Sequence, residues 1–390
     1  MIAEEAALAT VLDAVAPLGV ETILLAEARG RFAGEKVRAK FSLPGFDNSA
    51  MDGYAVRAAE GTKEARLRVA GEQPAGADRH LTLHEGEAIR IFTGAPIPSG
   101  ADAVVTQEDA RVENGRLRIS TDVQPGDYIR RRGGDLAEGQ QILARGDSIT
   151  PQAASLLASQ GIAKIAAGIL PRVAVLSTGD ELVSPGAPLT PGRLYESNGV
   201  MLEMLAANLG ASVTNLGIAA DEPKILHEKL ARGLQHDALV VSGGVSVGER
   251  DLVKSELKNL GAQLDVWRVA VKPGKPFLFG RGGACKIFGL PGNPVSSFVT
   301  FFCFVRPALR KMAGARDFAP GAQHAFAACE LRNEGDRPHY VRGKILHGKF
   351  SPCGRQESHA LFGLSQSNAL ARLAPGESIA AGEPVAVFQI

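Results

Sequence analysis

The second half of the chain alternates short apolar runs with segments of helical periodicity. From Leu170 onward the apolar runs are RVAVLST, ASVTNLGI, DALVVSGG and LDVWRVAV, and amphipathic stretches at residues 200–209, 223–234 and 252–260 separate them. A further run, CKIFGL, leads through a Gly/Pro turn into the apolar segment VSSFVTFFCFVRPALRKM. This alternation is typical of repeated βαβ units, so it predicts a doubly wound α/β sheet whose central strands are parallel.

A different pattern precedes Leu170. Short alternating runs such as RLRVAG, EAIRIFTG and RLRIS are separated by Gly, Pro and Asp turns, which predicts a small inserted β module over residues 40–138. Segments 1–39 and 139–169 flank this module and each contains a helical stretch. We expect the two segments to pack together as one discontinuous N-terminal domain.

Strand-like alternation returns near the C-terminus, in HYVRGKIL and EPVAVFQI, and predicts a C-terminal β-barrel. A Pro/Gly-rich stretch after Met312 marks the boundary before it. The predicted fold is therefore multi-domain α/β plus β, with a mostly parallel α/β domain at 170–316 and the barrel at 317–390.

Length and charge limit the possible functions. A chain of 390 residues that is 45% hydrophobic can bury more than one core. Lys and Arg (43) nearly balance Asp and Glu (42), so no global field attracts nucleic acid or an anionic membrane. The N-terminus lacks a signal-peptide pattern and no apolar run approaches the roughly 20 residues of a membrane span, so we expect a cytoplasmic protein. The four cysteines and eight histidines show no spacing suited to zinc.

Loops after the predicted strands carry the candidate chemistry, because open α/β sheets bind ligands at the carboxyl ends of their strands. STGDEL, residues 177–182, contains Asp180 and Glu181. These acids can hold a hard cation such as Mg²⁺, but a turn with solvated acids explains them equally well. Asp221 lies just before Pro223, a position that an ordinary helix cap also explains.

The stretch SGGVSVGERD, residues 242–251, joins a strand to a helix through three glycines and two serines. Its backbone N–H groups are unhindered and a helix N-terminus favours an anion, so it is a candidate phosphate cradle. It matches neither the Walker A pattern nor G-x-G-x-x-G. Asp251 closes the loop, where it can serve the site or cap the helix.

Two further loops belong to the same domain. VKPGKP, residues 271–276, places Lys272 and Lys275 on backbone stiffened by two prolines, which predicts a site for a small oxyanion unless the two lysines are simply solvated. GLPGNPVSS adds a Gly-rich turn at a helix start. Outside the sheet, FDNSAMDGYAV, IFTGAPIP and IRRRGGD are each explained as turns when taken singly.

Taken in chain order, DNSAMDGYAVR, TGAP, RRGGD, STGDEL, SGGVSVGERD, KPGKP and GLPGNPVS resemble the MoeA family, the molybdopterin molybdotransferases that include the E domains of gephyrin-type proteins. The resemblance implies the last step of molybdenum cofactor biosynthesis, in which adenylylated molybdopterin and molybdate are converted, with Mg²⁺, to molybdenum cofactor and AMP. It also implies a homodimer with shared sites and transient contacts with a molybdopterin adenylyltransferase and with recipient molybdoenzymes.

By motif position, the resemblance implies two sets of site residues. The catalytic set is Asp52, Thr93, Asp135, Glu181, Asp221 and Asp251, among which Asp52, Glu181 and Asp251 are the candidate metal ligands. The cofactor-binding set is Ser242, Gly243, Gly244, Ser246, Gly248, Lys272, Lys275, Pro291, Gly292, Asn293, Ser296, Arg342 and Ser358. Asp52, Thr93 and Asp135 are expected to complete the site of the partner subunit.

Two other functions compete with the transferase. The sister enzymes that adenylylate molybdopterin share the sheet domain, but they carry a TGGTG-type loop where this chain has SGGVSVG and they lack the flanking β domains. A non-catalytic dimeric scaffold of the gephyrin E-domain type is expected to lose acids or lysines from the loops, and this chain retains them. The sequence therefore favours an enzyme.

Overall fold

The computed structural model describes residues 1–244 and 252–390. These residues form two compact units. Unit 1 contains Met1–Glu35, Arg145–Ala154 and Ala163–Ile390, and unit 2 contains Lys36–Ala144 and Ser155–Ile162.

The centre of unit 1 is a six-stranded sheet with the strand order β16-β13-β17-β20-β19-β18. Neighbours among β16, β13, β17 and β20 are parallel, whereas β19 is antiparallel to both of its neighbours. The strands are β13 (Arg172–Thr178), β16 (Ser212–Ala219), β17 (Ala238–Ser242), β18 (Gln263–Arg268), β19 (Pro276–Gly282) and β20 (Cys285–Leu290). The predicted mostly parallel sheet is confirmed, and β19 is an addition that the periodicity did not reveal.

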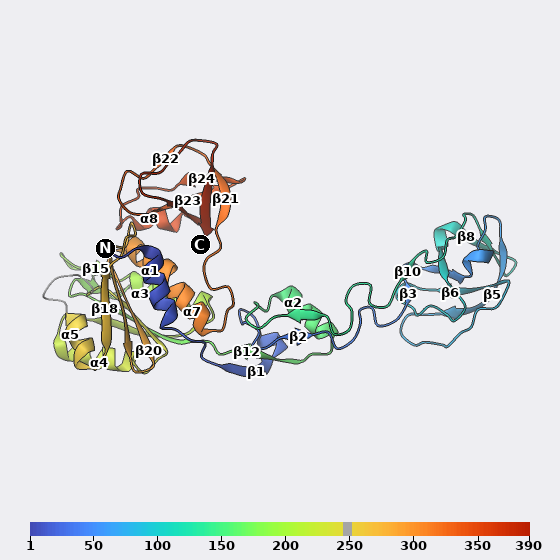
Figure 1. Ribbon diagram of the computed structural model, residues 1–390, viewed down its shortest axis with the longest axis horizontal. Helices are drawn as coiled ribbons and strands as arrows, with labels where there is room; N and C mark the ends of the chain where they lie inside the picture. The colour runs from blue at the N-terminus through green and yellow to red at the C-terminus, as the bar shows by residue number, and fades with distance from the viewer. Residues whose placement is uncertain (245–251) are drawn as a thin grey trace. The chain divides into compact units, whose positions relative to one another are not determined.

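Helices cover both faces of this sheet (Figure 1). Val173 and Val240 pack towards α1, α3 and the helical segment α6–η4–α7, whereas Leu176 and Leu239 pack towards α4 and α5. The helices are α1 (Glu4–Asp13), α3 (Asn198–Asn208), α4 (Pro223–Gly233), α5 (Leu252–Asn259), α6 (Pro294–Thr300), the π-helical η4 (Phe301–Val305) and α7 (Arg306–Met312). Because both faces are buried, the central strands are continuous apolar runs.

The C-terminal residues of unit 1 form a closed barrel with the order β21-β24-β23-β25-β27. Phe350, Leu373 and Val387 lie in its buried core. The barrel strands are β21 (Gln323–Ala327), β23 (His339–Leu346), β24 (Lys349–Pro352), β25 (Ala369–Leu373) and β27 (Pro384–Gln389), with β22 (Leu331–Arg332), β26 (Ser378–Ile379) and α8 (Leu361–Ser365) beside them. The predicted C-terminal barrel is therefore confirmed.

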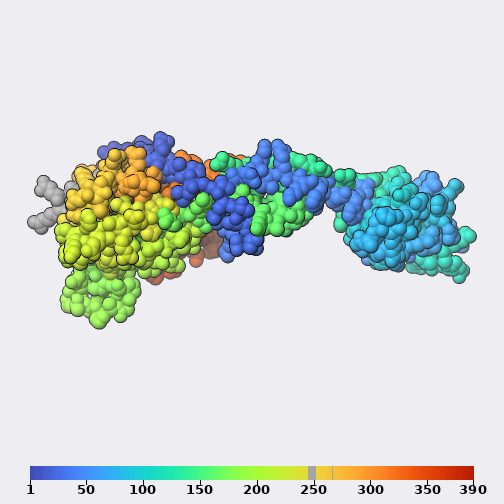
Figure 2. Space-filling model, turned by 90° about the horizontal axis from the view of Figure 1, so that it is seen from below, coloured from blue at the N-terminus to red at the C-terminus, as the bar shows by residue number. Residues whose placement is uncertain are grey.

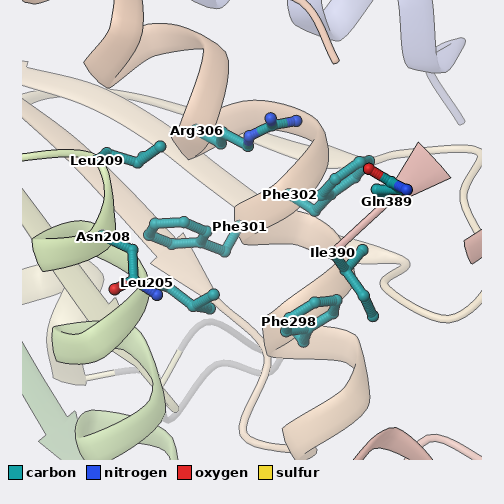
Figure 3. Close-up of a pocket in the computed structure, with 9 residues that line it drawn as sticks. All are labelled: Leu205, Asn208, Leu209, Phe298, Phe301, Phe302, Arg306, Gln389 and Ile390. Carbon is teal, nitrogen blue, oxygen red and sulfur yellow. The ribbon is translucent and has the colours of Figure 1, made fainter. Parts of the chain in front are cut away.

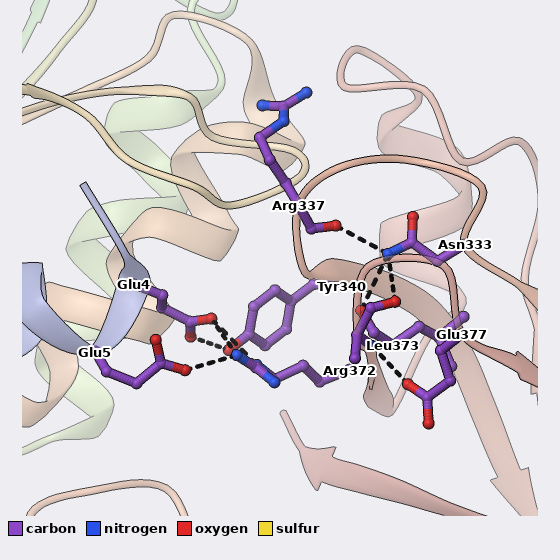
Figure 4. Close-up of polar contacts among 9 residues, drawn as sticks. Glu4, Glu5, Asn333, Arg337, Tyr340, Arg372, Leu373 and Glu377 are labelled. Atoms are coloured by element: carbon purple, nitrogen blue, oxygen red, sulfur yellow. Dashed lines mark hydrogen bonds and ion pairs between the residues drawn. The ribbon is translucent and has the colours of Figure 1, made fainter. Parts of the chain in front are cut away.

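Polar contacts attach the barrel to the first helix (Figure 4). The Tyr340 hydroxyl and Arg372 Nε both donate to the carboxylate of Glu4, and Arg372 Nη2 donates to Glu5 at 2.8 Å. On the barrel side, Asn333 Nδ2 donates to the Leu373 carbonyl at 3.2 Å. Since α1 packs on the sheet, these contacts hold the barrel beside the α/β layers.

Short pairings complete unit 1. The segments before and after the inserted module meet where β1 (Val20–Leu24) pairs with β12 (Lys164–Gly168). Residues between β14 (Leu182–Val183) and β15 (Leu194–Tyr195) are largely exposed and stand out in light green in Figure 2. The helical turn η1 (Leu25–Glu27) also belongs to unit 1, whereas α2 (Pro151–Ser159) is divided between unit 1 and unit 2. The limits of the four predicted domains stay a prediction.

Unit 2 is built on a second six-stranded sheet, with the order β7-β4-β6-β5-β9-β8. Its core includes Val56, Leu67 and Leu117. The strands of this sheet are β4 (Gly53–Val56), β5 (Arg66–Gln73), β6 (Glu87–Ile91), β7 (Ala103–Thr106), β8 (Ala110–Glu113) and β9 (Arg116–Ile119). Two short strand pairs lie outside the sheet, β2 (Val37–Arg38) with β11 (Gln141–Leu143) and β3 (Asn48–Ser49) with β10 (Ile129–Arg130). The helical turns are η2 (Ala58–Glu60) and η3 (Gln107–Asp109). The alternating pattern correctly predicted a β module here.

Within the described residues, no helix combines the length and the apolar character that crossing a membrane requires.

Candidate active site

A cavity of about 1370 Å³ lies where the parallel strands of unit 1 end. The loops that follow β13, β16, β17 and β20 line it, as expected for the carboxyl edge of an open α/β sheet. Among the predicted site residues, those that line the cavity are Glu181, Asp221, Ser242, Gly243, Gly244, Pro291, Gly292 and Asn293. Residues from four separate parts of the chain are thus brought together.

An acidic group occupies one side of this cavity. The backbone N–H of Asp221 donates to Asp180 Oδ1 at 3.0 Å. Partial desolvation, together with the negative charges of Asp180 and Glu181, raises the pKa of Asp221 above its usual value. The N-cap of α4 is Glu222, without a side-chain cap hydrogen bond, so helix capping does not explain Asp221.

The glycine loop begins directly after β17. Gly243 and Gly244 have φ angles of +87° and +62°, a region that strongly favours glycine. A Cβ atom at Gly243 would lie 2.5 Å from the Thr178 carbonyl oxygen, and one at Gly244 would lie 2.4 Å from Val253 Cγ2. The backbone conformation and the close contacts therefore require glycine at both positions. Ser246, Gly248 and Asp251 lie outside the described residues, so their predicted roles stay predictions.

The barrel reaches the loop that follows β20. Asn293 Nδ2 donates to Ser358 Oγ at 3.0 Å, and the Val295 N–H donates to the Ser358 carbonyl at 3.0 Å. The neighbouring residue His359 lines the cavity. Ser358 therefore lies beside the predicted cofactor-binding loop although it is 65 positions away from Asn293 in the chain.

Arg342 holds the segment that carries Ser358. Its side chain is buried, its Nη1 donates to the Glu357 carbonyl at 3.1 Å, and its Nη2 donates to the Arg355 carbonyl. Arg342 does not itself line the cavity. Ser296 is likewise buried and does not line the cavity, and its carbonyl accepts a hydrogen bond from Thr300 Oγ1.

The lysine loop connects β18 to β19 at the same edge of the sheet, and its Lys272-Pro273 peptide bond is cis. The Lys272 N–H donates to the Pro338 carbonyl, and the Lys272 carbonyl accepts from the Tyr340 N–H at 2.8 Å. Lys275 is exposed. Neither lysine lines the cavity.

His339 lies beside this loop, and sequence reasoning missed it. It is 7% exposed, and neither ring nitrogen has a hydrogen-bond partner among the described residues. Burial and then the positive charges of Lys272, Arg342 and Arg337 lower its pKa to about 4. The surroundings of the lysine loop are therefore electropositive.

Two further residues of the cavity wall were missed, Glu196 and Asn198. The buried Glu196 accepts hydrogen bonds from Ser177 Oγ at 2.9 Å and from the Gly199 N–H at 2.5 Å. Asn198 is the first residue of α3. The signal that could have found them is ESNG, a group of small and polar residues at the start of the first helix after β13.

The three motifs of unit 2 also meet. Asp52 Oδ1 accepts hydrogen bonds from the Thr93 N–H at 2.7 Å and from Thr93 Oγ1 at 2.8 Å, and these two donors lower the pKa of Asp52. Asp47 binds Arg131 Nη1 at 2.7 Å, which joins the first motif to RRGGD. Asp135, in that motif, is exposed.

A second cavity, of about 160 Å³, is predominantly apolar (Figure 3). It lies between α3, the helical segment α6–η4–α7 and the last two residues of the chain, and the Arg306 guanidinium stands over the Phe302 ring with 5.2 Å to the centroid. Its lining contains none of the predicted site residues. The predicted chemistry therefore belongs to the larger cavity.

Among the residues that the structure describes, no group of three or more His, Cys, Asp and Glu side chains is arranged to hold a metal ion.

Comparison with known proteins identifies the family. The family model "MoeA N-terminal region (domain I and II)" matches residues 2–161, "Probable molybdopterin binding domain" matches 174–311, and "MoeA C-terminal region (domain IV)" matches 324–390. A curated relative from Haemophilus influenzae, named molybdopterin molybdenumtransferase, is 38% identical over 95% of this chain and 94% of its own length. This chain belongs to the MoeA family.

Other relatives agree. A molybdopterin molybdenumtransferase from Nostoc sp. is 38% identical over 95% of this chain and 88% of its own length. The crystal structure of the molybdopterin biosynthesis MoeA protein from Pyrococcus horikoshii covers all of both chains with a TM-score of 0.87 and 28% identity. The predicted MoeA membership and the predicted transferase class are confirmed, and the names of the relatives support a role in molybdenum cofactor biosynthesis.

Proposed function

We propose that this MoeA-family chain is a molybdopterin molybdenumtransferase that inserts molybdate into adenylylated molybdopterin, with Mg²⁺-dependent release of AMP. The observation that carries the proposal is the cavity at the sheet edge, which combines glycine-loop backbone with an acidic group in one space. Cleavage of a phosphoanhydride depends mainly on positioning and on charge stabilisation. In the lining, the glycine loop can position the phosphates and the acidic group can hold a cation that stabilises charge.

The glycine loop is proposed to bind the phosphate groups. Gly243 and Gly244 line the cavity and carry no side chains, so no side chain of theirs hinders a phosphate oxygen that approaches their backbone. Ser242 adds a hydroxyl at the end of β17. Of the predicted cradle, Ser246, Gly248 and Asp251 lie outside the described residues.

Glu181 and Asp221, with Asp180 beside them, are the described carboxylates that fit Mg²⁺. Mg²⁺ in such enzymes is usually held by one or two carboxylates plus substrate phosphates and water, so a preformed cluster of three ligands is not required. The raised pKa of Asp221 supports a cation site here. The negative charges of Asp180 and Glu181 cause part of that pKa shift, and a bound cation would offset them. When bound, Mg²⁺ supplies positive charge beside the phosphoanhydride. Asp251 and Asp52 remain the other proposed ligands.

Molybdate is proposed to bind as a substrate near the lysine loop. Lys272 and Arg342 both lower the pKa of His339, which supports an electropositive environment for a dianion. Lys275 is exposed in the same loop as Lys272 and would complete the site. The Ser358 hydroxyl can donate to an oxyanion from the segment that Arg342 holds.

The active form is proposed to be a homodimer in the cytoplasm, with Asp52, Thr93 and Asp135 of one subunit completing the site of its partner. The clustering of the three motifs in unit 2 supports a shared role. Transient contacts with a molybdopterin adenylyltransferase and with recipient molybdoenzymes belong to the same proposal. A scaffold of the gephyrin E-domain type is less well supported, because the acid and lysine loops are retained.

AMP release from adenylylated molybdopterin by the purified full-length protein tests this function. Release is expected only when both molybdate and Mg²⁺ are present, and it should stop when EDTA is added. Lys275→Ala should raise the KM for molybdate, whereas Lys258→Ala, an exposed lysine of α5, serves as the matched control. Tight binding of the substrate without AMP release would favour the scaffold.

A further inference from the structure

Two segments from distant parts of the chain hold the lysine loop by its backbone. The barrel strand β23 holds one end, because the Lys272 N–H donates to the Pro338 carbonyl at 2.9 Å and the Lys272 carbonyl accepts from the Tyr340 N–H at 2.8 Å. Arg337 adds a third contact, since its Nη1 donates to the Val271 carbonyl at 3.1 Å. The position of Lys272 therefore depends on the position of β23.

The N-terminal segment holds the other end of the loop. The Val269 N–H donates to the Lys275 carbonyl at 2.8 Å and closes the loop. Val269 is fully buried and pairs with Ile2. The Ile2 N–H donates to the Arg268 carbonyl, and the Ile2 carbonyl accepts from the Ala270 N–H, both at 2.9 Å. The position of Lys275 therefore depends on the segment that contains Ile2.

Glu4 connects these two holding segments. It is the first residue of α1 and follows Ile2 closely in the chain. Its Oε1 accepts a hydrogen bond from the Tyr340 hydroxyl, and its Oε2 accepts one from Arg372 Nε at 3.1 Å (Figure 4). The Glu4 side chain is 12% exposed and Tyr340 is 4% exposed. Hydrogen bonds to a charged group that is shielded from water are strong, so Glu4 fixes β23 against the N-terminal segment.

The two lysines have to keep a fixed separation if they bind one small oxyanion. Two ammonium groups attract a dianion most strongly when both converge on it, and a small displacement of one of them weakens that attraction. Lys272 is held by the barrel and Lys275 by the N-terminal segment, and Glu4 joins the two. We propose that Glu4 is a positioning residue for the molybdate site, because it sets the relative placement of Lys272 and Lys275. This inference rests on the proposed function.

Calorimetric titration of the full-length protein with molybdate and, separately, with AMP tests this role. Glu4→Gln keeps the length of the side chain but replaces one of the two acceptor oxygens with a donor, so it cannot keep both contacts. It should raise the Kd for molybdate roughly threefold to thirtyfold, the range expected for a residue that acts through a packed network. The Kd for AMP should change less than about twofold, because neither lysine lines the cavity that is proposed to bind phosphate. Lys275→Ala should weaken molybdate binding at least as much as Glu4→Gln.

Glu5→Gln is the matched control for Glu4→Gln. Glu5 also binds Arg372, but the Glu5 side chain is 75% exposed, and pairing of an exposed charge contributes little. Both Kd values should therefore stay as in the wild type. Tyr340→Phe removes the hydroxyl donor to Glu4 but leaves the backbone N–H that binds Lys272. It should change the two Kd values in the same way as Glu4→Gln, and it replaces that variant if Glu4→Gln does not fold.

Thermal unfolding checks that each variant is folded at the temperature of the titrations. Equal weakening of molybdate and AMP, an unchanged Kd for molybdate in Glu4→Gln, or the same weakening in Glu5→Gln would each overturn the positioning role. If the wild-type protein does not bind molybdate, or if Lys275→Ala binds it as tightly as the wild type, the proposed molybdate site itself fails. That result is visible before Glu4→Gln is compared.

Discussion

Asp52 in unit 2 and Asp221 in unit 1 are both acids of predicted site loops, yet their pKa values shift in opposite directions. Two donors of Thr93 lower the pKa of Asp52. Desolvation and two neighbouring acids raise the pKa of Asp221. The Asp52 carboxylate is therefore satisfied by Thr93, from another loop of unit 2, whereas the charge of Asp221 needs a proton or a cation to offset it. Motif resemblance assigns both acids to the site. The pKa shifts distinguish them: the charge of Asp52 is already stabilised by hydrogen bonds, whereas the charge of Asp221 is not yet compensated.

The largest test of this difference is Asp221→Asn. We expect kcat/KM for AMP release to fall at least about 100-fold, the scale associated with losing one acid–base or charge-stabilising group. Thermal stability should not fall, because the substitution removes like-charge repulsion. Glu222→Gln, at the adjacent exposed N-cap of α4, should retain activity. Comparable losses in both variants would assign Asp221 a role in the local fold instead.

Mixing subunits tests whether the two acids serve one site. Asp52→Ala and Asp221→Ala homodimers should each be inactive. After exchange of equal amounts, random pairing makes half of the dimers mixed, and each mixed dimer has one site with both acids, so about a quarter of the wild-type activity should return. Gel filtration of the mixture checks that dimers form. Mixtures that stay inactive, although mixed dimers are present, would place both acids in the site of one subunit.

His339 extends the comparison to a buried base. Its folded-state pKa of about 4 lies below the ordinary value of 6.5, so between these pH values the unfolded chain binds more protons than the folded protein. Stability should therefore fall as the pH drops from 6.5 to 4, by on the order of 3 kcal/mol from this residue.

Denaturant unfolding at several pH values measures this effect of His339. His339→Gln should make the free energy of unfolding less dependent on pH within that window. His324→Gln, at an exposed position of β21, should keep the wild-type slope. Parallel curves for wild type and His339→Gln would mean that the folded protein protonates His339 normally.

The smallest expected effect concerns Thr93. Thr93→Val removes the hydroxyl donor to Asp52 but leaves the backbone N–H in place. The pKa of Asp52, followed by carboxyl-carbon NMR, should move part of the way back towards its ordinary value. Thr121→Val, an exposed threonine of unit 2, is the control. An unchanged pKa would show that the backbone donor alone fixes Asp52.

The sequence by itself determined the architecture and the order of the motifs. The apolar runs of RVAVLST and DALVVSGG predicted buried parallel strands, because strands covered on both faces need apolar side chains at successive positions. Alternation in HYVRGKIL predicted a barrel strand, although the first five residues of that strand are all buried in the structure. Glycines at 243 and 244 marked a close backbone approach. These features are local, so the chain encodes them within short windows.

Only the tertiary structure decided which side chains meet. Ser358 contacts Asn293 because the barrel packs beside the sheet, and no local pattern records that distance along the chain. The interpretation of Asp221 as the cap of α4 was excluded because Glu222 occupies the N-cap position. The Asn198 amide joins the loops after β17 and β20 only because the sheet brings the ends of those two strands together. Charge, burial and hydrogen-bond satisfaction depend on neighbours from distant segments, so they are fixed by packing and not by the local sequence.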